Sequence, residues 1–200
     1  MTGTIARVGD PQGARAPDAA AGDLRSWLRM CSAAEHARLD ASLGTLDVGD
    51  ADGYRRFLMA HAIGLAAVQP AAEDFVRRVL GRTLPDAAAM LAADMAEVGM
   101  AMPAGAPAPI PTAQGAGAAY VLLGSRMGMA VITRGVALPA GTTGRYLFDR
   151  DLGAMWKPMR DWLGAAAACG PQAAAALAGT RAAFAAFTAG ALAAHGGPRQ

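Results

Sequence analysis

The fold is decided first by residues 24–43, which read LRSWLRMCSAAEHARLDASL. Large apolar side chains return at helical spacing at Leu24, Leu28, Leu39 and Leu43. The remaining positions are rich in alanine and arginine, which are good helix formers, and runs of alternating β-branched residues are absent from the sequence. The stretch therefore predicts helix, and the same pattern along the rest of the chain predicts an all-α fold.

Helix start signals divide the chain that follows. Asp50 is the predicted N-cap of a second helix, Pro70 is expected to begin a third, and Pro85 with Asp86 a fourth. Residues 101–115 are too rich in proline and glycine for a helix and predict the longest connection. Further helices are expected over residues 116–133, 151–163 and 171–194.

One helical domain is predicted over residues 21–195, because a chain of 200 residues is long enough to bury a single core. Residues 1–20 contain almost no large apolar side chains, so they are predicted to be a disordered leader. Residues 196–200 are predicted to be a flexible tail.

Charge and composition favour a cytoplasmic protein with neither a nucleic-acid nor a membrane partner. The net charge is only +2 and the arginines are scattered, whereas nucleic-acid binding calls for clustered cations. The apolar stretches are interrupted before they reach the roughly 20 residues of a membrane span, and no secretory signal begins the sequence. Cys31 and Cys169 lack the spacing of zinc or redox motifs, so we expect reduced thiols.

His36 is the first candidate for a functional residue. On a helix it shares a face with Leu28 and Ser32, which would place the imidazole among apolar side chains. Such a ring either bonds to a neighbour in the core or binds a metal or heme iron through its free nitrogen. His61 lies on a similar apolar stripe and is the rival ligand, whereas His195 is expected to be exposed near the C-terminus.

Gly124 and Gly128 form the second candidate feature. They lie four residues apart in the apolar stretch YVLLGSRMGMAVI of residues 120–132. Glycine weakens a helix interior by about 1 kcal/mol relative to alanine, so two of them call for a compensating reason. Either another helix packs closely against them, or the backbone comes very near a flat ligand, and both explanations fit the pattern.

These two segments together resemble the biliverdin-producing heme oxygenase family, in particular its bacterial branch associated with phytochromes. Residues 28–36, LRMCSAAEH, resemble the proximal-helix pattern L-R-x-x-T-x-x-x-H, with Ser32 in place of threonine. Residues 120–128, YVLLGSRMG, look like the distal-helix pattern Y-V-L-x-G-S-x-x-G. The resemblance extends over roughly residues 23–190, nearly the whole predicted domain.

The resemblance implies a heme oxygenase-like helical array that cleaves heme, with O2 and external electrons, to biliverdin, carbon monoxide and ferrous iron. Heme would lie between two helices, bound through iron to a histidine on one side and facing bare backbone on the other. The implied catalytic residues of the distal helix are Gly124, Ser125 and Gly128. The implied heme-binding residues are His36 as the iron ligand, Tyr120 of the distal motif, and Arg29 and Arg160 as cations for the propionates.

The implied partners are heme, an electron donor such as a ferredoxin or a reductase, and a bacteriophytochrome. Ser125 stands where many relatives carry an aspartate, and a serine can also hold a water. Met129 stands where a glycine commonly follows, so its side chain either narrows the distal pocket or points away. The alternative function is a heme oxygenase-like fold that binds heme without cleaving it, or that binds another protein.

Overall fold

The computed structural model describes residues 22–104 and 107–196, and these residues form helices and connections without a strand, which confirms the predicted all-α fold. The predicted leader, residues 1–20, and residues 197–200 of the predicted tail lie outside the described residues. The helices are α1 (Leu24–Cys31), α2 (Ala33–Leu43), α3 (Ala51–Val79), α4 (Ala87–Glu97), a 3-10 turn η1 (Thr112–Gln114), α5 (Gly115–Ile132), α6 (Arg145–Phe148), α7 (Arg150–Ala154), α8 (Trp156–Ala165) and α9 (Gly170–Gly196).

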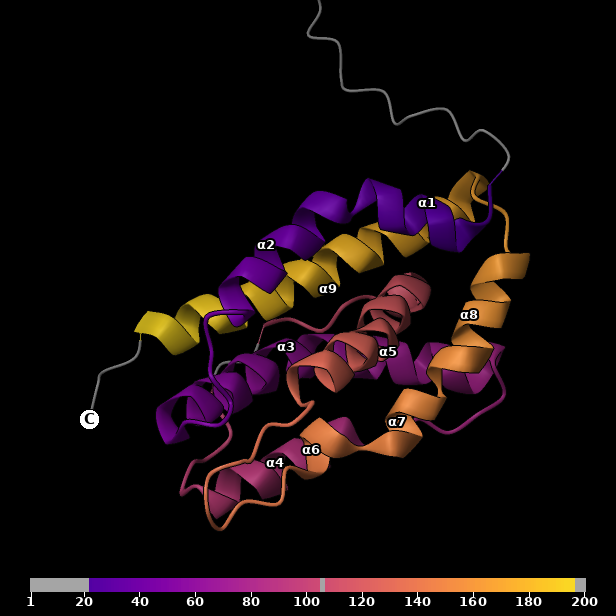
Figure 1. The fold of residues 1–200 in the computed structure, drawn as a ribbon. Coiled ribbons are helices and arrows are strands. Elements are labelled where there is room, and N and C mark those ends of the chain that lie inside the picture. The colour runs from indigo at the N-terminus through magenta and orange to yellow at the C-terminus, as the bar shows by residue number, and fades with distance from the viewer. Residues whose placement is uncertain (1–21, 105–106, 197–200) are drawn as a thin grey trace, which may run out of the picture.

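Three long helices, α3, α5 and α9, form the centre of the molecule and pack against one another. Helices α1 and α2 lie along α9, α4 packs on α3 and α6 packs on α4 (Figure 1). Helix α8 closes the end of the bundle beside α1, where the Leu24 amide donates to the Ala166 carbonyl at 3.0 Å. Helices α1, α2 and α5 all pack against α9. The α1–α2 segment and α5 therefore border a common space beside α9.

Two predicted helix starts, the N-cap at Asp50 and the start at Pro85 with Asp86, are confirmed. The Asp50 carboxylate accepts hydrogen bonds from the amides of Asp52 and Gly53, both at 3.0 Å, at the start of α3. The Asp86 carboxylate accepts from the Ala89 amide at 2.9 Å at the start of α4. Each carboxylate satisfies amides of the first turn that have no partner within the helix, so local sequence fixes where these two helices begin.

Pro70 does not begin a helix, and that prediction is wrong. The residue lies inside α3, which continues from Ala51 to Val79. A proline removes the hydrogen bond of its own amide and crowds the preceding turn, which usually ends a helix. Here Val68, Ala71 and Ala72, on either side of the proline, are buried in the core. Packing of this apolar face therefore holds the helix together across the proline.

Two stretches, residues 112–132 with α5 and residues 170–196 with α9, are long and apolar enough to cross a membrane by length and composition alone. Of the apolar window in each, 56% and 44% are buried inside the protein. Core helices of soluble proteins meet the same criterion. Since α5 and α9 pack on each other and on α3, central packing is one reason for their apolar composition.

Glycine allows α5 and α9 to cross in direct backbone contact. A Cβ atom at Gly117 would overlap the Ala176 carbonyl oxygen and the Thr180 amide of α9. A Cβ atom at Gly179 would in turn overlap the carbonyl of Gln114, just before α5. Close helix packing therefore explains the glycine in the first turn of α5.

Candidate functional site

A cleft of about 260 Å³ opens between the α1–α2 segment and α5. Three of the predicted site residues, Arg29, His36 and Tyr120, meet in it, although they come from parts of the chain more than 80 residues apart in sequence number. The residues that line the cleft are Arg29, Ser32, Ala33, His36, Ala37, Asp40 and Tyr120. Residues of α1 and α2 and their junction therefore form one wall of the cleft, and Tyr120 of α5 lies on the other.

His36 lies on the open wall of this cleft and not in the core. Its side chain is 62% exposed, which contradicts the prediction that apolar side chains surround the ring. Leu28 and Ser32 of the same stripe are buried, but α2 is turned so that His36 projects past them. Its ring also contacts the edge of Phe184 on α9, with 5.5 Å between ring centroids. The imidazole therefore faces solvent and the cleft together.

Asp40 fixes the orientation of the His36 ring, a role that the sequence analysis did not assign. Its carboxylate lies 2.8 Å from His36 Nδ1, one helical turn away on α2. With Nδ1 as the donor, Nε2 carries the lone pair and, among the described residues, has no hydrogen-bond partner. The signal in the sequence was the spacing of four between His36 and Asp40, which places both on one helix face.

His61, the rival ligand, is a core histidine. It is buried, its Nδ1 lies 2.8 Å from the Phe57 carbonyl, and its ring packs among Phe57, Tyr146 and Phe187. Burial lowers the pKa of His61 to about 4, so the ring is neutral at pH 7. A ring enclosed in this way has no open side for a ligand, and His36 is the histidine that faces the cleft.

Gly124 and Gly128 show a different environment from the glycines at the α5–α9 crossing. A Cβ atom at Gly128 would meet nothing within 4 Å, and one at Gly124 would make only ordinary contact, 3.6 Å, with the Trp156 ring. Gly124 lies one turn beyond Tyr120 on the same face of α5, but Gly124, Ser125 and Gly128 do not themselves line the cleft. Close helix packing therefore does not explain these two glycines.

The exposed face of α5 continues apolar beyond the glycines. Val131 is 67% exposed and Met127 is also exposed, and both share the face of Gly124 and Gly128 by helical spacing. Met129 is buried on the other side of the helix, so it points away from the cleft. The long side chain at this position therefore leaves the face of Gly128 open.

Ser125 is half-buried and turned toward its own helix. Its hydroxyl donates to the Leu122 carbonyl at 2.8 Å. Backbone bonding of this kind is common for serine in helices and uses the hydroxyl's single proton. In this conformation the hydroxyl can still accept a hydrogen bond from a group on the cleft side.

Aromatic and basic side chains border one end of the cleft. The Tyr120 and Trp156 rings lie 6.1 Å apart between centroids, and the Arg25 guanidinium lies 5.9 Å from the Trp156 ring. Burial raises the pKa of Tyr120, and the positive charges of Arg25 and Arg29 oppose that rise. Arg25 and Trp156 were not among the predicted site residues.

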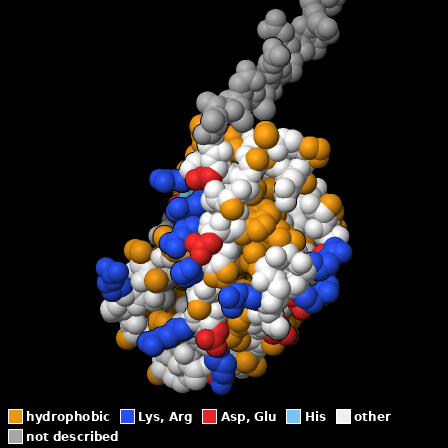
Figure 2. Space-filling model, turned by 90° about the vertical axis from the view of Figure 1, so that its right-hand side faces the viewer, with side chains coloured by type: hydrophobic (Ala, Val, Ile, Leu, Met, Phe, Trp, Pro, Cys, Tyr) orange, Lys and Arg blue, Asp and Glu red, His pale blue; other side chains and the backbone are white. Residues whose placement is uncertain are grey.

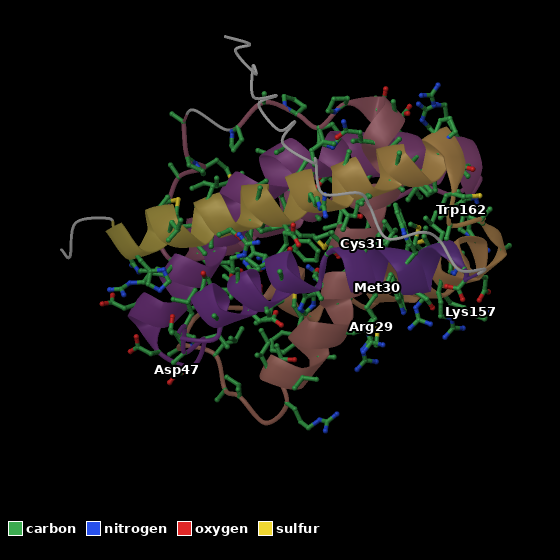
Figure 3. All side chains as sticks on the ribbon, turned by 90° about the horizontal axis from the view of Figure 1, so that it is seen from above. Arg29, Met30, Cys31, Asp47, Lys157 and Trp162 are labelled. Carbon is green, nitrogen blue, oxygen red and sulfur yellow. The ribbon has the colours of Figure 1, made fainter. Side chains whose placement is uncertain are left out.

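Basic side chains extend from the same side of the molecule. Figure 2 shows lysine and arginine side chains on both sides of an apolar patch on the face that includes the α8 side. In Figure 3, Arg29 of α1 and Lys157 of α8 reach out on the same side. Arg160, the second predicted propionate cation, is exposed on α8, pairs with Asp161 at 3.5 Å and does not line the cleft.

A larger cavity, of about 400 Å³, lies near the start of α3 and contains none of the predicted site residues. Its carboxylates include Asp47 and Asp50, which accept hydrogen bonds from nearby backbone amides. Figure 3 shows Asp47 at the far end of the molecule from Lys157 and Trp162. Within the described residues, no group of three or more His, Cys, Asp or Glu side chains gathers as a metal site, and both cysteines are free.

No protein-family model matches this chain, and no curated protein matches it. The geometry of the cleft and the sequences of the segments around it are therefore the basis for assigning a function.

Proposed function

We propose that this protein binds heme in the cleft between α2 and α5, with His36 as the iron ligand, and cleaves it as a heme oxygenase. The products would be biliverdin, carbon monoxide and ferrous iron. The co-substrates would be O2 and electrons from a ferredoxin or a reductase, and a bacteriophytochrome is the proposed further partner.

The observation that carries the proposal is an available imidazole nitrogen in the cleft and bare backbone on the face of α5 that continues beside it. A flat macrocycle with a central iron needs a ligand below it and free space above it. His36 lines the cleft and can meet the first need, and the α5 face that carries Gly124 and Gly128 can meet the second because no Cβ atom projects from either position. Ala33 and Ala37, which flank His36 in the lining, are too small to cover the imidazole.

Neighbouring side chains support each part of this arrangement. The Asp40 carboxylate accepts the Nδ1 proton of His36, which orients the ring. Arg29 lines the cleft and can pair with a propionate carboxylate, and Arg25 beside Trp156 adds a second positive charge at the same end. When bound, heme supplies both the iron that activates O2 and the ring that is cleaved.

The cleft alone is small, so a broad flat substrate would also have to cover the exposed face of α5 beside it. The cleft of about 260 Å³ is slightly smaller than the roughly 300–1,000 Å³ of typical ligand pockets. The exposed apolar face of α5, with Met127 and Val131, extends the surface beyond the cleft. A macrocycle that covers this face would bury apolar surface that is otherwise in water.

Heme binding without cleavage is the second candidate, and the Ser125 conformation favours it. The hydroxyl donates to the Leu122 carbonyl, so its proton is directed to the helix and not to the cleft. The neutral side chain also holds water less strongly than a carboxylate would. The protein would then keep an intact heme, or use the same fold to bind another protein.

Hemin titration of the purified protein tests the proposal. We expect a stoichiometric complex with the absorption spectrum of histidine-ligated heme, and we expect His36→Ala to lose that spectrum. His195→Ala is the matched control, because it removes an exposed imidazole from α9 and should leave the titration unchanged. His61→Gln should also retain the complex, since that ring is in the core.

Adding a reductase, NADPH and O2 to the complex then separates the two candidates. Growth of biliverdin absorbance with release of carbon monoxide supports the oxygenase, whereas an intact heme spectrum supports binding alone. A wild-type protein that takes up no hemin, or a His36→Ala protein with an unchanged spectrum, would refute both.

A further inference from the structure

Arg126 is a buried cation on the side of α5 that faces away from the cleft. It follows Ser125 directly, its residue is only 6% exposed, and its Nη1 donates to the Tyr146 carbonyl at 2.8 Å. Its guanidinium also lies over the Tyr146 ring, 4.3 Å from the centroid. Its Nε and Nη2 atoms are buried and have no hydrogen-bond partner among the described residues.

No carboxylate of the described residues neutralises this charge. The carboxylate bonded to the same segment is that of Asp94, which accepts hydrogen bonds from the backbone amides of Arg145 and Tyr146 at 2.8 and 2.9 Å. Asp94 has its own cation, because the Arg145 guanidinium lies 3.9 Å from it. His61, which packs against the Tyr146 ring, is buried and neutral at pH 7. The positive charge of Arg126 therefore remains uncompensated inside the protein.

An uncompensated buried charge lowers stability, and an apolar residue of similar volume often serves the fold equally well or better. Stability alone therefore does not account for an arginine at this position. What distinguishes the position is its neighbours along α5, since Gly124 and Gly128 lie two residues away on either side. Only the width of one helix, about 10–12 Å, separates the guanidinium from the open face.

We propose that Arg126 is a positioning residue that places a fixed positive charge behind the α5 wall and favours the ferrous over the ferric state of bound heme. This inference rests on the proposed function. Reduction of ferric iron takes one electron from the external reductase and removes one positive charge from the iron. A buried cation nearby makes that transfer more favourable, and the Tyr146 carbonyl and ring hold the cation in place.

The expected effect is large enough to measure. We take the guanidinium to lie one helix width, about 10–12 Å, from the heme iron. At an effective dielectric constant of about 20, a unit charge at that distance changes the ratio of the protein's affinities for ferrous and ferric heme by roughly tenfold. For a one-electron couple, tenfold corresponds to about 59 mV in midpoint potential. A purely structural role for Arg126 predicts no such shift.

Redox titration of the heme complex of Arg126→Met tests the inference. We expect the midpoint potential of the Arg126→Met complex to fall by about 59 mV, which corresponds to a tenfold change in the affinity ratio. Arg126→Lys keeps the charge, so its midpoint potential should stay near that of wild type. Arg126→Gln is a second neutral variant that can still donate to the Tyr146 carbonyl, in case the methionine protein does not fold. Arg55→Met is the matched control, because it removes an exposed arginine from α3.

Denaturation of the heme-free variants gives an independent readout. Arg126→Met is expected to be as stable as wild type or more stable, because it removes a buried charge. If the neutral variants bind heme with the wild-type potential, the inference fails and the proposed function stands. If the wild-type protein binds no heme, the proposed function fails, and this inference fails with it.

Discussion

Glycine and histidine each serve two different purposes in this fold. At the N-terminal end of α5, Gly117 is in backbone contact with α9, and the buried His61 of α3 lies in a sealed aromatic environment. Toward the C-terminal end of α5, a Cβ atom at Gly128 would contact nothing, and His36 is exposed on the wall of the cleft. The role of a glycine or a histidine in this fold therefore cannot be assigned until the groups around it are known.

This difference shows which residues the fold itself requires. Gly117 and the neutral His61 are explained completely by packing, so removing either should damage the folded state. Nothing in the packing of the described residues requires a missing side chain at Gly128 or an imidazole at position 36. Residues that the fold does not require are the ones whose change should alter a ligand and leave stability nearly intact.

Gly117→Ala should produce the largest loss of stability. The added Cβ atom would overlap the Ala176 carbonyl and the Thr180 amide, which are backbone groups and cannot rotate away. We expect the free energy of unfolding to fall by roughly 3 kcal/mol, at the upper end of overpacking effects. Urea denaturation followed by circular dichroism measures it. An unchanged midpoint and slope would show that α5 and α9 do not cross in backbone contact.

The pH dependence of stability should reveal the burial of His61 next. The pKa of His61 falls from 6.5 to about 4 on folding, because burial disfavours the charged ring. Between these two values the unfolded state binds the extra proton, so stability is complete above pH 6.5 and is lost as the pH falls toward 4. We expect His61 to account for about 2 kcal/mol of the stability lost between pH 7 and pH 5.

Urea denaturation at both pH values measures this loss in wild type and in His61→Gln. The variant should lose less stability over the interval, because glutamine has no proton to bind. Equal losses in wild type and His61→Gln would mean that His61 is not sealed from water in the folded protein.

The sequence predicted which segments come together better than it predicted how their side chains are oriented. Helical periodicity gave the all-α fold, and the N-caps at Asp50 and Asp86 gave two helix starts. The burial of His36 was mispredicted because Leu28 and Ser32 share its stripe, and periodicity does not record that α2 begins anew at Ala33 after a break at Ser32. Rotation of a short helix about its own axis is set by what it packs against, here α9.

Features that depend on contacts between distant parts of the chain could be found only from the folded structure. Pro70 was predicted to begin a helix because local sequence rules consider only the hydrogen bond that a proline removes. They do not consider that the apolar residues before and after Pro70 are buried in the core. Arg126 looked like one more arginine, since its burial depends on Tyr146, twenty residues later in the chain. Trp156 beside Gly124 is another such contact, because α8 meets α5 only after the intervening connection has folded back.

Gly128→Ala should have the smallest effect on folding and is the closest match to Gly117→Ala, since the same atom is added to the same helix. Its Cβ atom meets nothing within 4 Å, so no overlap opposes the better helix propensity of alanine. We expect the heme-free protein to gain about 0.5–1 kcal/mol in urea denaturation. Hemin affinity should fall at the same time, because the new methyl group projects from the wall that a flat macrocycle would cover. A variant that gains stability and binds hemin as wild type would show that the open face of α5 is not the surface that heme occupies.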